Sequence, residues 1–202
     1  MWAIITAAGW PIWPLIFASI IALGIIFERC WALRESNWLP PQLVADVCRG
    51  LGNFKDKQNL ARLAGHSPLG AMLAAGIVAH ARGESPDDAM QTQAGSLQAN
   101  MEKHLDVLSM IASAAPLMGL LGTVIGMIEI FAVQGSSVQS PEAIAAGIAV
   151  ALYNTAFGLI VAIPALVAYR LFRIRINTLL DKIGEAIKPF EDLLEPNRKA
   201  RP

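Results

Sequence analysis

The sequence has 202 residues, of which 54% are hydrophobic and 16% are charged, and its formal net charge is zero. With a mean hydropathy of +0.48, the chain is too apolar for an ordinary soluble domain of this length. The balanced charge gives no basic footprint for nucleic-acid binding, so we expect no nucleic-acid partner.

The first apolar segment covers roughly residues 10–33 and is long enough to cross the hydrocarbon of a bilayer. All five tryptophans flank this segment, where interfacial aromatic belts lie. A cleaved signal peptide is the alternative, but it requires basic residues before the apolar stretch, and residues 1–9 contain no Lys or Arg. We therefore expect residues 1–35 to form an N-terminal segment with a retained first transmembrane helix.

Residues 36–106 are expected to form a helical region in the cytoplasm. Turn and cap signals predict short helices near 40–50 and 55–64, and Ser67 followed by Pro68 predicts the start of a third. The apolar part of this third helix has about 12 residues, which is too short to span, so it is expected to pack inside a cytoplasmic bundle.

Histidines and cysteines in this region give no sign of a metal centre. His66 and His80 flank the third short helix without a ligand spacing, and we interpret them as surface or satisfied histidines. Cys30 and Cys48 both fall on the predicted cytoplasmic side and are interpreted as free thiols. No metal and no cofactor is therefore predicted.

Ser85 and Pro86 begin another predicted helix, for which the sequence offers no stop before residue 133 except Pro116. We expect one continuous helix of about 48 residues at ~1.5 Å each, in which 107–133 is the second transmembrane helix. Residues 134–143 form a periplasmic turn, and 144–172 form the third transmembrane helix. Residues 173–202 are a cytoplasmic helix and tail. Pro116 is expected to kink its helix or to be tolerated by neighbouring groups, and Pro164 is expected to kink the third transmembrane helix.

The distribution of basic residues predicts the orientation. No Lys or Arg precedes the first segment, and none lies in the turn between the second and third. The positive-inside rule then gives an N-terminus outside and a C-terminus inside. The predicted fold is an all-α integral membrane protein with three transmembrane helices, two of them extended far into the cytoplasm, plus short cytoplasmic helices.

Small residues recur at helical spacing in the last two transmembrane segments, and such stripes let helix backbones approach closely. One interpretation is that these two helices pack on each other within a subunit. The other is that the stripes also line a subunit interface or a central passage. The helix-packing residues are Gly119, Gly122, Gly126, Gly147, Ala151 and Gly158.

A few polar residues lie in the same two segments. Thr123 and Thr155 fall near mid-bilayer at matching depth beside the small stripes, and Asn154 adjoins the second threonine. A threonine in a membrane helix often bonds its own i−4 carbonyl, but two hydroxyls meeting here would also steady water or a partner's acid. Glu129 lies near the outer end, where it is either a functional acid or simply hydrated.

No enzyme motif is present, since the chain has no nucleotide loop, metal-binding helix or nucleophile elbow. We therefore do not expect an enzyme. No residue at mid-depth is able to hold a proton, and three helices cannot enclose a hydrated path alone. A channel would require oligomerisation, and its mid-membrane proton carrier would have to come from another polypeptide.

At residues 116–128 (PLMGLLGTVIGMI) and 147–158 (GIAVALYNTAFG) the sequence resembles the TolQ/ExbB/MotA proton-channel family, and it is most similar to ExbB-type members. The resemblance implies a ring, typically of five subunits, around two transmembrane helices of an ExbD- or TolR-like partner whose aspartate carries protons. Such rings lie among the lipids of the Gram-negative inner membrane and drive a periplasm-spanning protein such as TonB or TolA. Thr123 and Thr155 match the family's pore threonines.

One departure from the family pattern is Val150, where several relatives carry a glutamate. A proton route that relies on that carboxylate is therefore in doubt. The leading hypothesis is an ExbB-like subunit that couples proton flow to TonB-type transport across the outer membrane. A TolQ-like subunit for envelope maintenance and a non-conducting membrane scaffold are the alternatives, and the motifs do not fix the ring number or the cargo.

Overall fold

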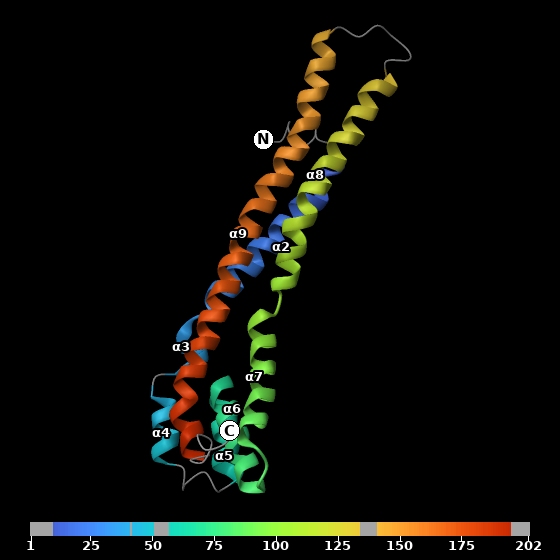
Figure 1. Cartoon of the computed structure of the whole chain (residues 1–202). Coiled ribbons are helices and arrows are strands. Elements are labelled where there is room, and N and C mark those ends of the chain that lie inside the picture. Colours follow the sequence, from blue (N-terminus) through green and yellow to red (C-terminus); the bar gives the residue numbers. More distant parts are fainter. Residues whose placement is uncertain (1–9, 41, 51–56, 134–140, 195–202) are drawn as a thin grey trace, which may run out of the picture. The chain divides into compact units, whose positions relative to one another are not determined.

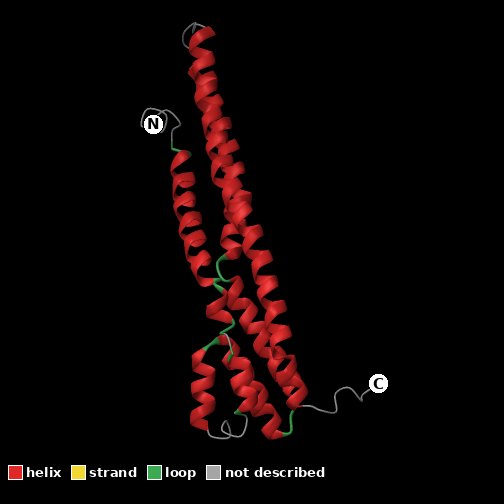
Figure 2. Ribbon diagram, turned by 90° about the vertical axis from the view of Figure 1, so that its left-hand side faces the viewer, coloured by secondary structure: helices red, strands yellow, loops and turns green. Residues whose placement is uncertain are grey.

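The computed structural model describes residues 10–40, 42–50, 57–133 and 141–194, and every element in this part of the chain is a helix (Figures 1 and 2). This confirms the predicted all-α class. Most of the predicted periplasmic turn and the end of the tail lie outside the described residues. The elements are α2 (Ile12–Ala32), α3 (Glu35–Trp38), α4 (Leu43–Arg49), α5 (Lys57–His66), α6 (Pro68–Arg82), α7 (Pro86–Glu102), α8 (Leu105–Val133) and α9 (Pro141–Leu194).

Three helices are long and apolar enough to cross a membrane, as the sequence predicted. They are α2, α8 and α9, and the last is a single helix of 54 residues. The chain divides into two compact units. The span unit comprises the chain up to Arg29 together with His104–Leu171, and the bundle unit comprises Cys30–Lys103 and the chain from Phe172 onward.

The core of the span unit lies where its three helices meet. Leu15 of α2, Ala115 of α8 and Ala162 of α9 are buried against one another. Met118, Phe157 and Val161 pack around them. Two of the three central side chains are alanines, so the helices approach closely at this level.

The bundle unit is built around α6, which packs against both α5 and α7. Ser67 caps α6 by accepting a hydrogen bond from the Gly70 amide at 3.0 Å, and Ser85 caps α7 in the same way. The structure therefore confirms both predicted N-caps and the packing of the short apolar helix within a bundle. The largest fully buried side chains of this unit include Leu69, Leu73, Met90, Met101 and Phe190.

The expectation of one continuous helix from Pro86 to residue 133 is wrong. The helix α7 ends at Glu102, and α8 begins at Leu105. Between them, Lys103 has non-helical backbone angles, with φ of −48° and ψ of 135°, and His104 adopts a left-handed conformation with φ of 65°. No glycine or proline lies at this break, so the sequence contains no local signal that predicts it.

The two intramembrane prolines do not end their helices. Pro116 lies inside α8, and Pro164 lies inside α9. A proline inside a helix removes one backbone hydrogen bond, and neighbouring helices in a membrane tolerate that loss. The kinks at these positions remain predictions.

Candidate functional site

The contact between α8 and α9 is built from small residues that bring the two backbones together. A Cβ atom placed on Gly158 would lie 2.6 Å from the carbonyl oxygen of Ala115 and 3.1 Å from the Cα of Gly119. A Cβ placed on Gly119 would lie 2.7 Å from the carbonyl oxygen of Asn154. Because the atoms in the way belong to the backbone, only glycine fits at these two positions.

The same contact continues toward the C-terminal end of α8 and the N-terminal end of α9. Gly122 lies against the side chain of Asn154, and Gly126 lies against Ala151. Farther along, Gly147 of α9 faces the side chain of Ile130. All six predicted packing residues therefore lie in helix contacts within one chain. Their second predicted role, at a subunit interface or passage, remains a prediction.

Thr123 and Thr155 meet across this contact, as their matching depth predicted. Their hydroxyl oxygens are 2.5 Å apart. The Thr123 hydroxyl also lies 3.1 Å from the carbonyl oxygen of Gly119, its own i−4 residue, and the Thr155 hydroxyl lies 3.3 Å from the same oxygen. The Thr123 hydroxyl thus contacts its own i−4 carbonyl and the Thr155 hydroxyl at the same time. A role of the pair in steadying water or a partner's acid remains a prediction.

The hydrogen bonds of this pair can be counted. Each hydroxyl has one proton and two lone pairs. If Thr155 donates to Thr123, then Thr123 donates to Gly119, and in the reverse arrangement Thr155 donates to Gly119. Both arrangements keep the two protons inside the site and use one lone pair, so three lone pairs remain open to a third group. Because both side chains are only partly buried, a third group is able to reach them.

The remaining predicted polar residues lie in different surroundings. Asn154 is buried at 2% exposure inside the α8–α9 contact rather than on an open surface. Val150 is half-buried, and Glu129 is exposed on α8. Glu129 is six residues from Thr123, or ~9 Å along the helix axis, so it lies outside the hydroxyl pair. The role of Asn154 in lining an ion path and that of Glu129 as a polar site near the end of its helix remain predictions.

Two charged clusters were not recognised from the sequence. In the span unit, Glu28 lies within hydrogen-bond distance of Arg29 and His104. In the bundle unit, Glu35 accepts a hydrogen bond from the Lys182 ammonium at 2.7 Å, and Arg175 lies 3.6 Å away. The Lys182 hydrogen bond, more than the charge of Lys182 or Arg175, holds the pKa of Glu35 below its ordinary value. These contacts join residues 76 and 147 positions apart, so no local signal reveals them.

The cysteines agree with the sequence-based interpretation. Cys30 is exposed and Cys48 is half-buried, and both are free. Burial raises the pKa of the Cys48 thiol. Among the described residues, no group of three or more His, Cys, Asp and Glu side chains is placed to hold a metal ion.

Comparison with known proteins places this site in a family context. Residues 64–185, which include the whole α8–α9 contact, match the model of the MotA/TolQ/ExbB proton channel family. An ExbB-like biopolymer transport protein of Synechocystis sp. is 36% identical over 169 residues, which cover 80% of this chain and 66% of the relative. The chain thus spans just under two thirds of that relative.

Two further relatives bear different functional names. The biopolymer transport protein exbB1 of Vibrio cholerae is 27% identical, with 89% of this chain and 82% of the relative covered. The Tol-Pal system protein TolQ of Pseudomonas aeruginosa is 29% identical, with 96% and 92% covered. The identity to the two types is nearly equal, so it does not distinguish between them.

Proposed function

This chain belongs to the MotA/TolQ/ExbB proton channel family, and from that premise we propose that it is the ring-forming subunit of a complex that converts the proton-motive force into work at the outer membrane. It is a non-enzymatic, multi-pass membrane subunit of proton-driven energy transduction. More specifically, the proposal is an ExbB-like role in TonB-type transport. The hydroxyl pair of Thr123 and Thr155 carries the proposal.

The proposed location is the inner membrane of a Gram-negative bacterium, with the N-terminus outside and the C-terminus in the cytoplasm. The absence of Lys and Arg before α2 and between α8 and α9 supports this orientation. In this arrangement the bundle unit lies in the cytoplasm. Its charged exterior and its buried Leu, Met and Phe side chains fit an aqueous environment.

The proposed proton carrier is an aspartate of an ExbD- or TolR-like single-pass partner. A protonated carboxyl group is able to donate to one of the lone pairs that remain open on the two threonine hydroxyls. A carboxylate requires a donor instead, and rotation of the hydroxyl that points at the Gly119 carbonyl supplies one. The threonine pair therefore accommodates the partner's acid in both protonation states, and this allows the acid to gain and lose a proton while it stays in contact with the pair.

The proposed ring contains five copies of this chain. Three helices are too few to enclose a path, and α8 keeps a row of exposed aliphatic side chains that one copy does not cover. These side chains are Leu117, Leu120, Leu121, Val124 and Ile128. In a ring, neighbouring copies, partner helices and lipid would cover them, so their exposure in one chain supports assembly.

Two alternatives have specific support. The nearly equal identity to a TolQ protein supports a role in envelope maintenance. The presence of Val150, where several members of the family carry glutamate, supports a scaffold that does not conduct protons. An adjacent gene encoding a small single-pass protein with an intramembrane aspartate would favour the conducting complex over the scaffold.

Substitution of Thr155 by valine tests the proposal, because valine keeps the shape of threonine and removes the hydroxyl. We expect Thr155→Val to lower proton-driven activity by about tenfold or more, the effect of losing roughly one hydrogen bond to a charged group. The ring should still co-purify with its partner. Activity is measured in cells, and assembly of the same variant is measured by native mass spectrometry.

The matched control is Thr178→Val. Thr178 also lies in α9 and also bonds its i−4 carbonyl, that of Ile174, but it is exposed in the bundle unit. We expect this variant to retain full activity. Unchanged activity of the Thr155 variant in an intact assembly would contradict the proposal and favour the scaffold.

A further inference from the structure

The three places where the chain passes between the two units differ in kind. At Arg29–Cys30 the chain runs inside α2, and at Leu171–Phe172 it runs inside α9. At Lys103–His104 it runs through the break between α7 and α8, which we call the joint. The joint is thus the one crossing that is not helical, and an unrestrained joint would absorb a displacement of α8.

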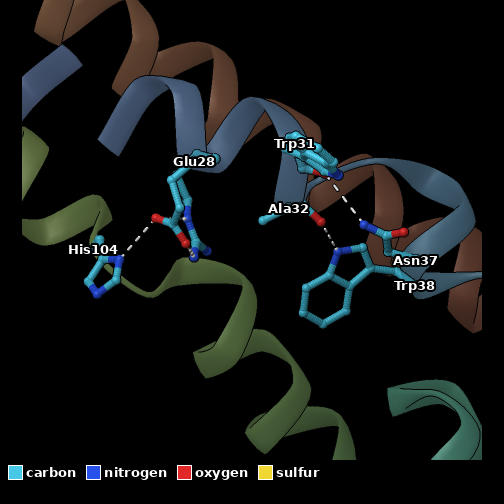
Figure 3. Close-up of polar contacts among 7 residues, drawn as sticks. Glu28, Trp31, Ala32, Asn37, Trp38 and His104 are labelled. Atoms are coloured by element: carbon cyan, nitrogen blue, oxygen red, sulfur yellow. Dashed lines mark hydrogen bonds and ion pairs between the residues drawn. The ribbon is translucent and has the colours of Figure 1, made fainter. Parts of the chain in front are cut away.

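The side chain of His104, at the joint, lies against α2 in the same unit (Figure 3). Its Nδ1 atom is 3.1 Å from Oε2 of Glu28. Arg29 contacts both oxygens of the same carboxylate, through Nε at 3.1 Å and Nη2 at 2.5 Å. With a guanidinium on both oxygens Glu28 is ionised and accepts only, so the Nδ1 atom of His104 must carry a proton and donate.

Backbone conformation makes the position of His104 dependent on such support. A residue other than glycine with positive φ is uncommon, and this conformation persists where surrounding contacts fix it. The carbonyl oxygen of His104 also accepts the first hydrogen bond of α8, from the Leu108 amide at 3.3 Å. The neighbouring Leu105 and Leu108 side chains are fully buried. One end of α8 is therefore defined at this residue.

The end of α2, on the bundle side of Arg29, is capped by side chains of the residues that follow it. The indole nitrogen of Trp38 donates to the carbonyl oxygen of Ala32 at 2.6 Å, and the Asn37 amide donates to that of Trp31 at 3.4 Å (Figure 3). These bonds satisfy two carbonyl groups that a helix terminus leaves without intrahelical partners. The last turn of α2 is thus capped by the residues that follow it.

We propose that Glu28, Arg29 and His104 form a clasp that holds the joint against the inner end of α2, so that movement of α8 is passed into α7 instead of being absorbed at the break. His104 and Glu28 are positioning residues in this device. The clasp concerns movement within one chain and requires no particular route for protons. Its test uses a structural readout and is independent of proton flux.

The test is hydrogen exchange measured by mass spectrometry on the full chain in lipid nanodiscs, over a peptide that contains residues 103–109. Glu28→Gln leaves the shape of the site and the backbone of His104 in place but removes the charge that Arg29 and His104 contact. We expect exchange at the joint to become about tenfold faster, the change for roughly one charged hydrogen bond. Exchange over residues 176–190 of α9 should stay unchanged.

The controls separate the clasp from its surroundings. Asp106→Asn removes a nearby acid that is exposed and outside the clasp, and it should leave exchange within twofold of the wild type. His104→Ala should match Glu28→Gln, and the double variant should exchange no faster than either single variant, since both changes remove one contact. His104→Asn, which tolerates positive φ but is shorter, should also match and replaces the alanine variant if that one fails to insert.

Three outcomes would overturn the proposal. The first is exchange in Glu28→Gln within twofold of the wild type. The second is an additive increase in the double variant, which would show that Glu28 and His104 act separately. The third is an equal increase in Asp106→Asn, which would show that any lost acid near the membrane boundary loosens the joint.

Discussion

One face of α9 is buried in both units, but the side chains on this face differ in size between the two units. From Ala151 to Leu194 the buried positions recur every three or four residues, apart from one step of seven between Ala165 and Phe172, and this is the spacing of one helix face. Within the span unit these residues are small, and within the bundle unit they are large. The small set is Ala151, Asn154, Gly158, Ala162 and Ala165, and the large set is Phe172, Ile176, Leu179, Ile183, Ile187, Phe190 and Leu194.

The difference shows how surroundings decide what a helix buries. In lipid, burying a large apolar side chain against another helix gains little, because the lipid tails are equally apolar, so close packing of small residues dominates. In water, the same burial removes apolar surface from the solvent and stabilises the fold directly. The change in side-chain size between Ala165 and Phe172 therefore indicates where the lipid environment ends, in agreement with the exposed Arg170 between them.

Two glycines illustrate the same contrast at atomic scale. The closest atoms to a Cβ on Gly158 are backbone atoms of α8, which cannot move without shifting the helix. The closest atoms to a Cβ on Gly76 of α6 are side-chain atoms of Met90 and Phe190. A methionine is flexible and able to adapt. Packing in the span unit is therefore the less adaptable of the two.

The largest expected effect comes from truncating the core of the bundle unit. Phe190 is fully buried and contacts the site of Gly76, so Phe190→Ala should lower the free energy of unfolding by about 3–5 kcal/mol. The nearby Leu193 is 53% exposed, and Leu193→Ala should have little effect. Chemical denaturation in detergent, followed by circular dichroism, measures both variants. Equal losses would contradict the assignment of this part of α9 to a water-exposed bundle.

A smaller effect is expected from enlarging a residue in the span unit. The Cβ of alanine at position 158 would press on the backbone of α8, so Gly158→Ala should cost about 1–3 kcal/mol and weaken assembly. Gly24 of α2 has no neighbouring atom within 4 Å, and Gly24→Ala is the matched control. Thermal aggregation in detergent ranks the variants. If both glycines tolerate alanine equally, the backbone contact between α8 and α9 is not as close as described.

The smallest expected effect is a pH-dependent one in the bundle unit. The Lys182 hydrogen bond lowers the pKa of Glu35 in the folded chain, so this contact contributes stability above the unfolded pKa and loses it as pH falls through the folded value. Lys182→Met should therefore lower the unfolding midpoint slightly at neutral pH and have no effect once Glu35 is protonated. The exposed Lys188 supplies the control, Lys188→Met. A difference that persists in acid would contradict the role of this ion pair.

The features that the sequence predicted correctly depend on nearby residues or on regular spacing. Ser67 and Ser85 each sit one residue before a proline at a helix start, and both cap their helices. The three membrane-spanning helices were predicted from the length of their apolar segments alone. The meeting of Thr123 and Thr155 followed from counting residues inward from the adjoining ends of the two spans, which places both threonines at the same depth.

The features that the sequence could not predict depend on contacts between distant residues. The break at His104 has no glycine or proline, and its left-handed backbone is accompanied by a contact to Glu28, 76 residues away. Similarly, Glu35 begins the short helix α3 and accepts a hydrogen bond from Lys182, 147 residues away, which no local pattern reveals. Local propensity favours a continuous helix at residue 104, and tertiary contacts override it.

The central claim is that this chain supplies the walls and hydroxyls of a proton path while a partner supplies the acid. It is tested most directly by proton uptake into liposomes that contain a pH-sensitive dye. We predict that liposomes with this chain alone take up no more protons than empty ones, and that uptake appears when a single-pass partner with an intramembrane aspartate is added. Regulated, proton-selective uptake by the chain alone would contradict the claim.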